Sequence, residues 1–271
     1  MKTDLEEIRI KRDYKVVKAN ALIQRARYDL TIAELKILAY LFSMVKPNDG
    51  IGTTYEISFS DFSRICGMQY RSGKAYNDIK KSLKSIGDKS FWVLEEDGDE
   101  VLTRWIDKVE LSRAHGRAVI RFDPTIEKYI HGLFRDFTEY TLLSTLPMKC
   151  IYSFRIYEML KSYAFTKQHH FEIDDFKKLL NAESYVRFPD FRRKVIEPAI
   201  REINLYTDLA VSCEPELKGR KVIGLTFYIE KRDMWEQALA RQRATDKLDG
   251  VQMTIEDFLG PFDGNGKAVN E

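Results

Sequence analysis

Cysteine and histidine are scarce in this sequence, and their spacing supports neither a disulfide framework nor a metal site. The three cysteines, Cys66, Cys150 and Cys213, lie far apart and form no CxxC pair, so we expect reduced, mostly buried thiols. No histidine is followed four residues later by another, the spacing that places two metal ligands on one face of a helix. We therefore expect no metal and no other cofactor.

Long apolar runs are also missing. No run approaches the roughly 20 residues that cross a bilayer, and the segment 1–12 is too charged to hold the apolar core of a signal peptide. We expect a cytoplasmic protein without a membrane partner. With only 14 glycines and 7 prolines among 271 residues, and 44% hydrophobic residues, the chain should fold, and its length favours two domains.

The chain as a whole has no large excess of positive or negative charge, since its net charge is +2. The charged residues are nevertheless unevenly distributed along it. Residues 1–28 carry eight Lys and Arg against four Asp and Glu, and residues 71–89 carry six against two. Residues 246–271 carry two against six. This asymmetry indicates a body that binds a polyanion and an acidic tail; the alternative is that these charges only solvate the surface.

The first half of the chain alternates between helical and strand patterns. Thr31 is a candidate N-cap with Glu34 as its capping-box partner, and Ser72 can cap a later helix. The periodicity predicts helices over 31–45, 60–67 and 73–86 and strands over 54–58, 90–95, 101–111 and 117–122. The turn 96–99 between the first two long strands is acidic, and we expect it to be the tip of a β-wing.

The second half repeats this order. We expect helices over 147–164, 174–180 and 191–205, strands over 170–173, 209–213 and 221–229, and a closing helix over 233–245. Helix, strand, short helix, helix and hairpin is the order of a winged helix. The sequence thus predicts an α+β protein with two tandem winged-helix domains (helix-turn-helix plus β-wing) related by internal duplication. The expected boundaries are 1–138 for a domain that dimerises and contacts DNA, 139–247 for the main DNA-reading domain and 248–271 for a flexible acidic tail.

The helix predicted over 191–205 carries basic side chains near its N-terminus, where a recognition helix contacts base edges. Arg193, Lys194 and Arg201 lie opposite the apolar stripe, and an arginine there can form a bidentate pair with guanine. Asp190 either caps the helix or accepts from a cytosine amine. Arg192 lies on the buried-side half of the helical wheel, so we expect it to pair with a carboxylate or a phosphate. The alternative is an exposed helix held by ion pairs.

The predicted wings provide a second kind of contact. Lys218, Arg220 and Lys221 lie at the second hairpin, where they can contact phosphates or the minor groove, or simply solvate a turn. In the first domain, the candidate DNA-contacting side chains come from the helix predicted over 73–86, and they are Lys74, Asn77 and Lys81. The acidic turn 96–99 would repel phosphates, so we expect the two domains to engage their targets differently.

Three stretches of the sequence, 16–23, 153–160 and 188–204 followed by 219–221, resemble the iteron-binding replication initiators of theta-replicating bacterial plasmids. The resemblance covers about residues 14–232. It implies two winged-helix domains that bind origin iterons as a monomer and repress their own promoter as a dimer over an inverted repeat. It also implies a dimer formed through the first domain, host replication proteins as partners, and Arg187, Asp190, Arg193 and Lys194 as base readers.

Two classes of enzyme fit the sequence poorly. Rolling-circle initiators need two histidines separated by an apolar residue on a strand, but His169 and His170 are adjacent and would point to opposite faces. No GxxxxGK[ST] loop is present for ATP hydrolysis. We therefore expect a DNA-binding protein that is not an enzyme. A winged-helix transcriptional regulator without a replication role remains the alternative.

Overall fold

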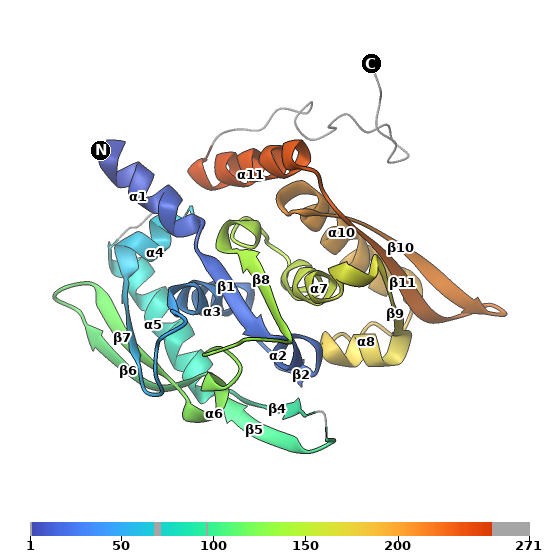
Figure 1. The fold of residues 1–271 in the computed structure, drawn as a ribbon, viewed down its shortest axis with the longest axis horizontal. Coiled ribbons are helices and arrows are strands. Elements are labelled where there is room, and N and C mark those ends of the chain that lie inside the picture. Colours follow the sequence, from blue (N-terminus) through green and yellow to red (C-terminus); the bar gives the residue numbers. More distant parts are fainter. Residues whose placement is uncertain (1, 68–71, 96, 251–271) are drawn as a thin grey trace.

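A helix, a strand, a short helix, a longer helical segment and a β-hairpin occur in this order in both halves of the chain, and the first half contains further elements (Figure 1). The computed structural model describes residues 2–67, 72–95 and 97–250. The first half comprises α1 (Lys2–Arg12), β1 (Lys15–Ala19), α2 (Asn20–Gln24), β2 (Ala26–Arg27), α3 (Ile32–Met44), β3 (Thr54–Ser58), α4 (Phe59–Ile65), α5 (Ser72–Asp88), β4 (Ser90–Leu94), β5 (Glu100–Arg104), β6 (Ile106–Ser112), β7 (Arg117–Phe122), α6 (Pro124–Glu127) and β8 (Phe137–Thr141). The second half comprises η1 (Leu142–Ser144), α7 (Ile151–Ser162), η2 (Ala164–Thr166), β9 (Gln168–Glu172), α8 (Ile173–Leu179), α9 (Phe188–Phe191), η3 (Arg192–Ile196), α10 (Glu197–Tyr206), β10 (Leu209–Lys218), β11 (Lys221–Lys231) and α11 (Met234–Asp249).

Local sequence signals place several of these elements correctly. Thr31 caps α3 as predicted: its hydroxyl accepts from the Glu34 amide at 3.3 Å, and its own amide donates to the Glu34 carboxylate at 2.7 Å. The strand predicted over 54–58 is β3. In α5, Ile79, Leu83 and Ile86 are buried, which is the stripe that the helical periodicity predicts.

The two winged-helix domains are confirmed by their matching sheets. In the first, the strand order is β3-β7-β6, and in the second it is β9-β11-β10. In each sheet the strand before the short helix pairs with the second strand of a later hairpin, β6–β7 in the first domain and β10–β11 in the second, and this hairpin forms the wing. Strands β4 and β5, with β2, form an additional sheet that the second domain lacks.

The strand predicted over 101–111 is instead two strands in two different sheets. The chain bends at Trp105, whose indole is 1% exposed and stacks on Phe91 with ring centroids 4.3 Å apart. Burying this large ring breaks the strand, so that β5 pairs with β4 whereas β6 pairs with β7. The acidic turn 96–99 therefore belongs to the β4–β5 hairpin, and the prediction that it forms the tip of the first wing is wrong.

Other element boundaries also differ from the sequence prediction. Helix α7 begins at Ile151 rather than at Pro147. Both strands of the second wing are longer than predicted, since β10 continues to Lys218 and β11 to Lys231. Pro215 does not end β10, because it lies on an edge strand, where its missing donor leaves the pairing intact. Helix α11 continues to Asp249, and the rest of the acidic tail, residues 251–271, lies outside the described residues.

Two of the stretches that resemble plasmid initiators meet in a buried polar network between the halves. Lys18 of β1 pairs with Glu158 of α7, and both side chains are almost completely buried. The hydroxyl of Tyr140 donates to the same carboxylate at 2.5 Å. Arg155 pairs with Tyr28 and donates to the Ala26 carbonyl at 3.1 Å. These residues therefore join α7 to the first half of the chain, out of reach of a duplex.

Candidate nucleic-acid interface

The predicted recognition helix is a helical segment in three parts, α9, the π-helical turn η3 and α10. Pro198 has no amide hydrogen to donate to the Lys194 carbonyl, and the helix widens just before it. At this point the Glu197 amide donates to the Arg192 carbonyl, five residues earlier. A proline inside a helix is expected to kink the helix or to mark a shifted start. Here it instead changes the winding locally, and the helical segment continues to Tyr206.

This segment presents its basic residues to solvent. Arg187, Arg193, Lys194 and Arg201 are all exposed, and Arg187 precedes the first helical residue. Arg193 is 69% exposed and donates to Asp190 at 3.3 Å. Within the described residues, Arg187, Lys194 and Arg201 form no ion pair. Their charges are therefore available to an anionic ligand: Arg187 and Lys194 lie towards the N-terminal end of the segment, and Arg201 lies further along it in α10.

Two expectations for this helix need correction. Asp190 is not the N-cap, because Arg187 holds that position and Asp190 is the third helical residue. Arg192 is not on a buried side: its side chain is 59% exposed, because the wider π-helical turn rotates it outwards. The expected carboxylate partner is present, since the Arg192 Nε lies 3.0 Å from Glu197.

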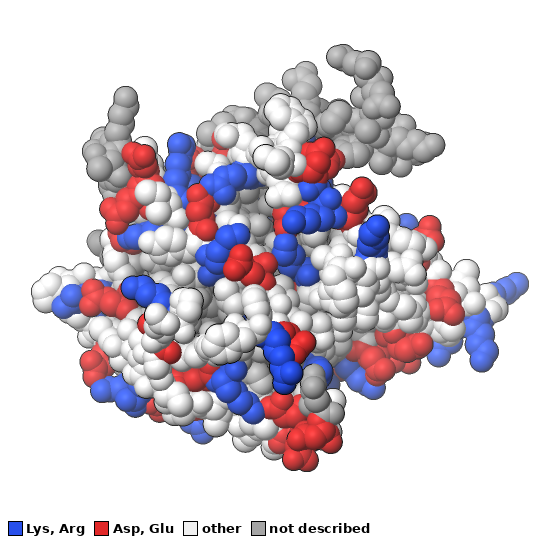
Figure 2. Space-filling model, viewed as in Figure 1, with Lys and Arg blue, Asp and Glu red and all other residues white. Residues whose placement is uncertain are grey.

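The second wing projects from the body and ends in a tight turn. Gly219 has a φ of +65°, which glycine adopts without steric strain, and Lys218, Arg220 and Lys221 surround it, all exposed. Lys218 pairs across the hairpin with Lys221. Figure 2 shows Lys and Arg side chains at the outer end of the β10–β11 hairpin, on the right of the view. The wing end is therefore a basic surface.

Packing beneath this surface fixes the helix relative to the wing. Phe191 is fully buried. The ring of Phe176 contacts two other aromatic rings: its centroid lies 6.4 Å from that of Phe191 and 5.6 Å from that of Phe227. Asn204 of α10 forms two hydrogen bonds with Val211 of β10, at 2.9 and 2.7 Å. The helical wheel places Asn204 on the polar face, but it does not indicate that this side chain connects the helix to the strand.

In the first domain the corresponding helix is α5. Asn77 and Lys81 are exposed on it, whereas Lys74 lies in the helix and its side chain is outside the described part of the structure. The first wing is the β6–β7 hairpin, whose turn carries Arg113, and the Arg113 guanidinium lies 6.0 Å from the centre of the Tyr76 ring of α5. A basic turn therefore adjoins α5. The sequence pattern does not indicate Arg113, because it places the wing at the acidic turn 96–99.

Most basic side chains of the N-terminal segment 1–28 form ion pairs within the protein. This contradicts the interpretation of their charge as a polyanion-binding surface. Arg12 and Lys18 are buried, with Asp249 and Glu158 as their partners. Arg9, Lys11 and Arg27 pair with Asp249, Asp61 and Glu183, respectively. Counting charges along the sequence cannot reveal such ion pairs, because their acidic partners lie far away in the chain.

Within the described residues, no helix is long and apolar enough to span a membrane, and no group of three or more His, Cys, Asp or Glu side chains is arranged to hold a metal ion. Burial raises the pKa of Cys66 to about 12 and that of Cys213 to about 12, so these thiols are protonated at neutral pH. The exposed basic residues of the helix N-terminus and of the wing end, called together the basic face, are the strongest candidate site; they are Arg187, Arg193, Lys194, Lys218, Arg220 and Lys221.

Comparison with known proteins places this surface in context. An uncharacterized 27.6 kDa protein of Escherichia coli is 24% identical over 222 residues, which span 76% of this chain and 91% of that protein. The PI protein of Escherichia coli is 24% identical over 263 residues, 81% of this chain and 86% of that protein. The fold also matches the crystal structure of the Pi initiator protein in complex with iteron DNA, with a TM-score of 0.67 and 22% identity over 82% of this chain and 99% of that chain.

Two family profiles match consecutive parts of the chain. The profile of the first winged-helix domain (WH1) of initiator replication proteins matches residues 15–161. The profile of the second winged-helix domain (WH2) of initiator Rep proteins matches residues 172–229, the part that contains the basic face. The chain therefore belongs to the initiator replication protein family.

Proposed function

We propose that this protein binds the repeated iterons of a plasmid origin as a sequence-specific double-stranded DNA-binding protein, and that this binding initiates plasmid replication. The observation that carries the proposal is the basic face, in which an exposed helix N-terminus and a basic wing end belong to one rigidly packed domain. The relative of similar fold that was crystallised with iteron DNA supports the same target. The protein would act in the cytoplasm, where plasmids lie, and without catalysing a reaction itself.

The two parts of the basic face would do different work. Arg187, Arg193 and Lys194 would enter the major groove and read base edges, with Asp190 orienting Arg193 through their 3.3 Å contact. Lys218, Arg220 and Lys221 would contact phosphates, which fixes the register of the protein without reading sequence. Arg201, further along the helix and outside the basic face, would do the same. Arg192 would remain paired with Glu197 or reach a phosphate.

We further propose that the first domain, residues 1–138, contributes a second DNA contact through α5. Lys74, Asn77 and Lys81 would face the duplex from this helix, and Arg113 would contact the backbone from the neighbouring wing turn. The second domain would comprise residues 139–247 and do most of the reading. Because α7 packs against both halves, it would hold the two domains together.

The target can be tested by selecting binding duplexes from a random pool with the full-length protein. We expect the selected sequence to recur in the DNA that flanks the gene as tandem repeats spaced by about two helical turns. A selected sequence that occurs there only as one palindrome would favour a transcriptional regulator instead. Binding without any sequence preference would contradict both functions.

Lys221→Ala is expected to weaken binding to all duplexes alike, because a phosphate contact carries no sequence information. It should also lower the slope of log K against log salt by about 0.9, the counterion released per contact. Gel-shift titrations at several salt concentrations would measure both effects. Lys231→Ala, at the other end of β11, is the matched control and should change neither. A loss confined to the selected duplex would show that Lys221 reads a base.

We also propose that a dimer of this protein represses its own promoter, and that β5 forms the contact between the two copies. Strand β5 is the edge of the β2-β4-β5 sheet, and its outer face carries Leu102, 51% exposed, beside Trp92, 52% exposed. If two copies of β5 pair antiparallel around Leu102, each Glu100 faces the Arg104 of the other copy. This charge complementarity favours a second copy of the chain as the partner.

Leu102→Asp is expected to leave the protein monomeric at concentrations where the wild type dimerises, because two carboxylates would meet at the centre of the contact. Sedimentation velocity over a concentration series measures this. Ile51→Asp, in an exposed turn, is the control and should dimerise normally. Reversing both charges, Glu100→Arg with Arg104→Glu, should restore what either reversal alone disrupts. A Leu102→Asp protein that dimerises like the wild type would exclude this surface.

A further inference from the structure

The last helix, α11, follows the second winged-helix domain but ends against the first. Figure 1 shows it passing from α10 across the top of the molecule towards α1. Ala240, Ala244 and Leu248 recur at four-residue steps and are buried, so one face of α11 lies on the body of the protein. The C-terminal turn of the helix therefore lies far in sequence from the residues that it contacts.

A charged clasp holds this end of α11. The two carboxylate oxygens of Asp249 accept from Arg12 at 2.6 Å and from Arg9 at 2.9 Å. Arg12 is 2% exposed, and its other nitrogens donate to the carbonyls of Ile65 at 2.9 Å and Arg64 at 3.0 Å. These carbonyls lie at the end of α4, where a cation is favourable. One guanidinium thus connects α1, α4 and α11.

A glycine lets α11 approach this closely. Gly67, just after α4, has a φ of +66°, and a Cβ added there would lie 2.4 Å from the Leu248 carbonyl oxygen. Any side chain at position 67 would therefore push the backbone of α11 away. Since α4 packs against α5, the DNA-facing helix of the first domain, the position of α11 is coupled to the position of α5.

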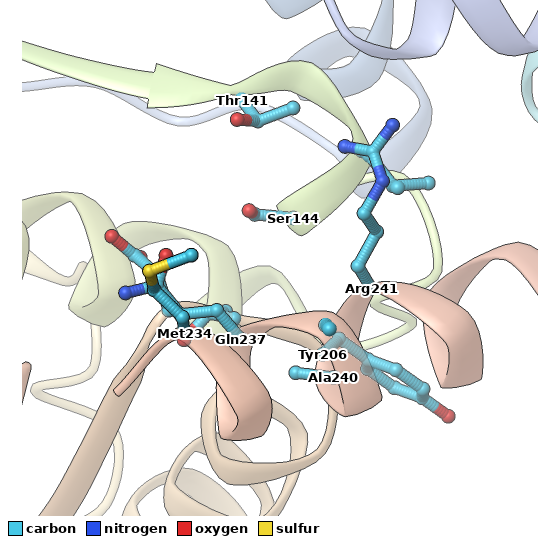
Figure 3. A pocket seen from close by; sticks show the side chains of 11 residues that line it. Thr141, Ser144, Tyr206, Met234, Gln237, Ala240 and Arg241 are labelled. Carbon is cyan, nitrogen blue, oxygen red and sulfur yellow. The ribbon is translucent and has the colours of Figure 1, made fainter. Parts of the chain in front are cut away.

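A cleft lies beside the first half of α11. The cleft has a volume of about 320 Å³ and lies between α11, the end of α10 and the segment around η1. Figure 3 shows Arg241 extending from α11 across this cleft, towards the segment that carries Thr141 and Ser144. Arg241 pairs with Asp13, which follows α1. A second ion pair thus connects α11 to the first domain.

We propose that α11 is a strap that sets the distance and rotation between the two winged-helix domains, with Asp249, Arg12 and Gly67 as positioning residues for DNA binding. The proposal rests on the proposed function, because it assumes that both domains contact one duplex. Two linked binding units gain affinity from each other only when their separation matches that of their sites. A fixed separation would make binding sensitive to the spacing within the DNA target.

Gly67→Ala tests the strap, and Gly98→Ala is its matched control. Both glycines have positive φ, +66° and +91°, so alanine strains the backbone at both positions. Only at Gly67 does the added Cβ meet α11, since nothing lies within 4 Å at Gly98. In hydrogen exchange on the protein alone, we expect the α11 amides of Gly67→Ala to exchange at least tenfold faster than those of wild type and Gly98→Ala.

The second readout is the spacing of the DNA target. Hydroxyl-radical footprints locate the parts of the selected duplex that each domain covers, and two base pairs are then inserted between them. We expect the wild type to lose at least tenfold in affinity on insertion, whereas Gly67→Ala, weaker on the original duplex, loses less than threefold. Equal behaviour of Gly67→Ala and Gly98→Ala, or a wild type that tolerates the insertion, would overturn the proposal.

A second variant guards against misfolding of Gly67→Ala. Asp249→Asn removes the charge of the clasp without a steric clash, and it should accelerate exchange in the last turns of α11 and reduce the sensitivity to insertion. Asp107→Asn, which breaks an exposed pair with Arg121, should do neither. If the wild type binds no selected duplex, the proposed function fails, while hydrogen exchange still decides whether Gly67 and Asp249 fix α11.

Discussion

Replacing Glu158 by Gln is expected to lower the free energy of unfolding by about 3 to 5 kcal/mol, the usual cost of removing one partner from a buried ion pair. The side chain of Glu158 is fully buried and faces the ammonium group of Lys18, which is 4% exposed. The Arg155 guanidinium also lies 3.9 Å away. Without the carboxylate, two buried cations lose their counterion, and water cannot reach them. Urea unfolding followed by circular dichroism would measure the loss.

A matched control separates burial from charge. Glu139→Gln removes an ion pair with Lys15 whose side chains are about half exposed, and it should cost less than about 1 kcal/mol. In the double variant Lys18→Met with Glu158→Gln, the loss should be well below the sum of the two single losses, because the unpaired ammonium is gone. A loss for Glu158→Gln no larger than that of Glu139→Gln would contradict the role of this network.

Arg193→Ala is expected to reduce discrimination at one base position by about 1 to 3 kcal/mol, the value of one bidentate contact. The contact of Arg193 with Asp190 is exposed and 3.3 Å long, so it can orient the guanidinium without preventing its free nitrogens from binding a guanine. Affinity for random duplexes should fall much less. Titrations against the selected duplex and its single-base variants would locate the position that Arg193 reads.

The control for this experiment is Arg135→Ala, which removes an exposed arginine that also pairs with a neighbouring aspartate, Asp136, in a loop of the first half. It should leave the discrimination among base variants unchanged. Equal losses for Arg193→Ala on selected and random duplexes would assign Arg193 to a phosphate and remove it from the base-reading group. Arg187 and Lys194 would then remain as the candidate base readers of the helix.

Local patterns predicted much of this fold because their determinants lie within a few residues of one another. The capping box of Thr31 and Glu34, the strand 54–58 and the apolar stripe of α5 are examples. The same holds for the exposure of Arg193 and Lys194, which follows from helical periodicity. Their contact with DNA is still a prediction, since exposure alone does not identify a ligand.

Other features depend on residues that are distant in the chain, and no local pattern could reveal them. Trp105 interrupts a strand because its ring completes an aromatic core. The charge pattern of the N-terminus gave no sign that Arg12 and Lys18 would be buried, since their partners Asp249 and Glu158 lie 237 and 140 residues further on. Periodicity also could not place the first wing, because pairing between strands is decided by the whole sheet.

Sequence patterns alone were enough to predict two winged-helix domains and the basic helix and wing of the second. Which charges remain available to a ligand, and how the domains are joined, became clear only from the packed chain. The difference is one of range: hydrophobic periodicity and capping act within a few turns, whereas an ion pair or a close approach such as that of Gly67 and Leu248 exists only once distant segments have packed together.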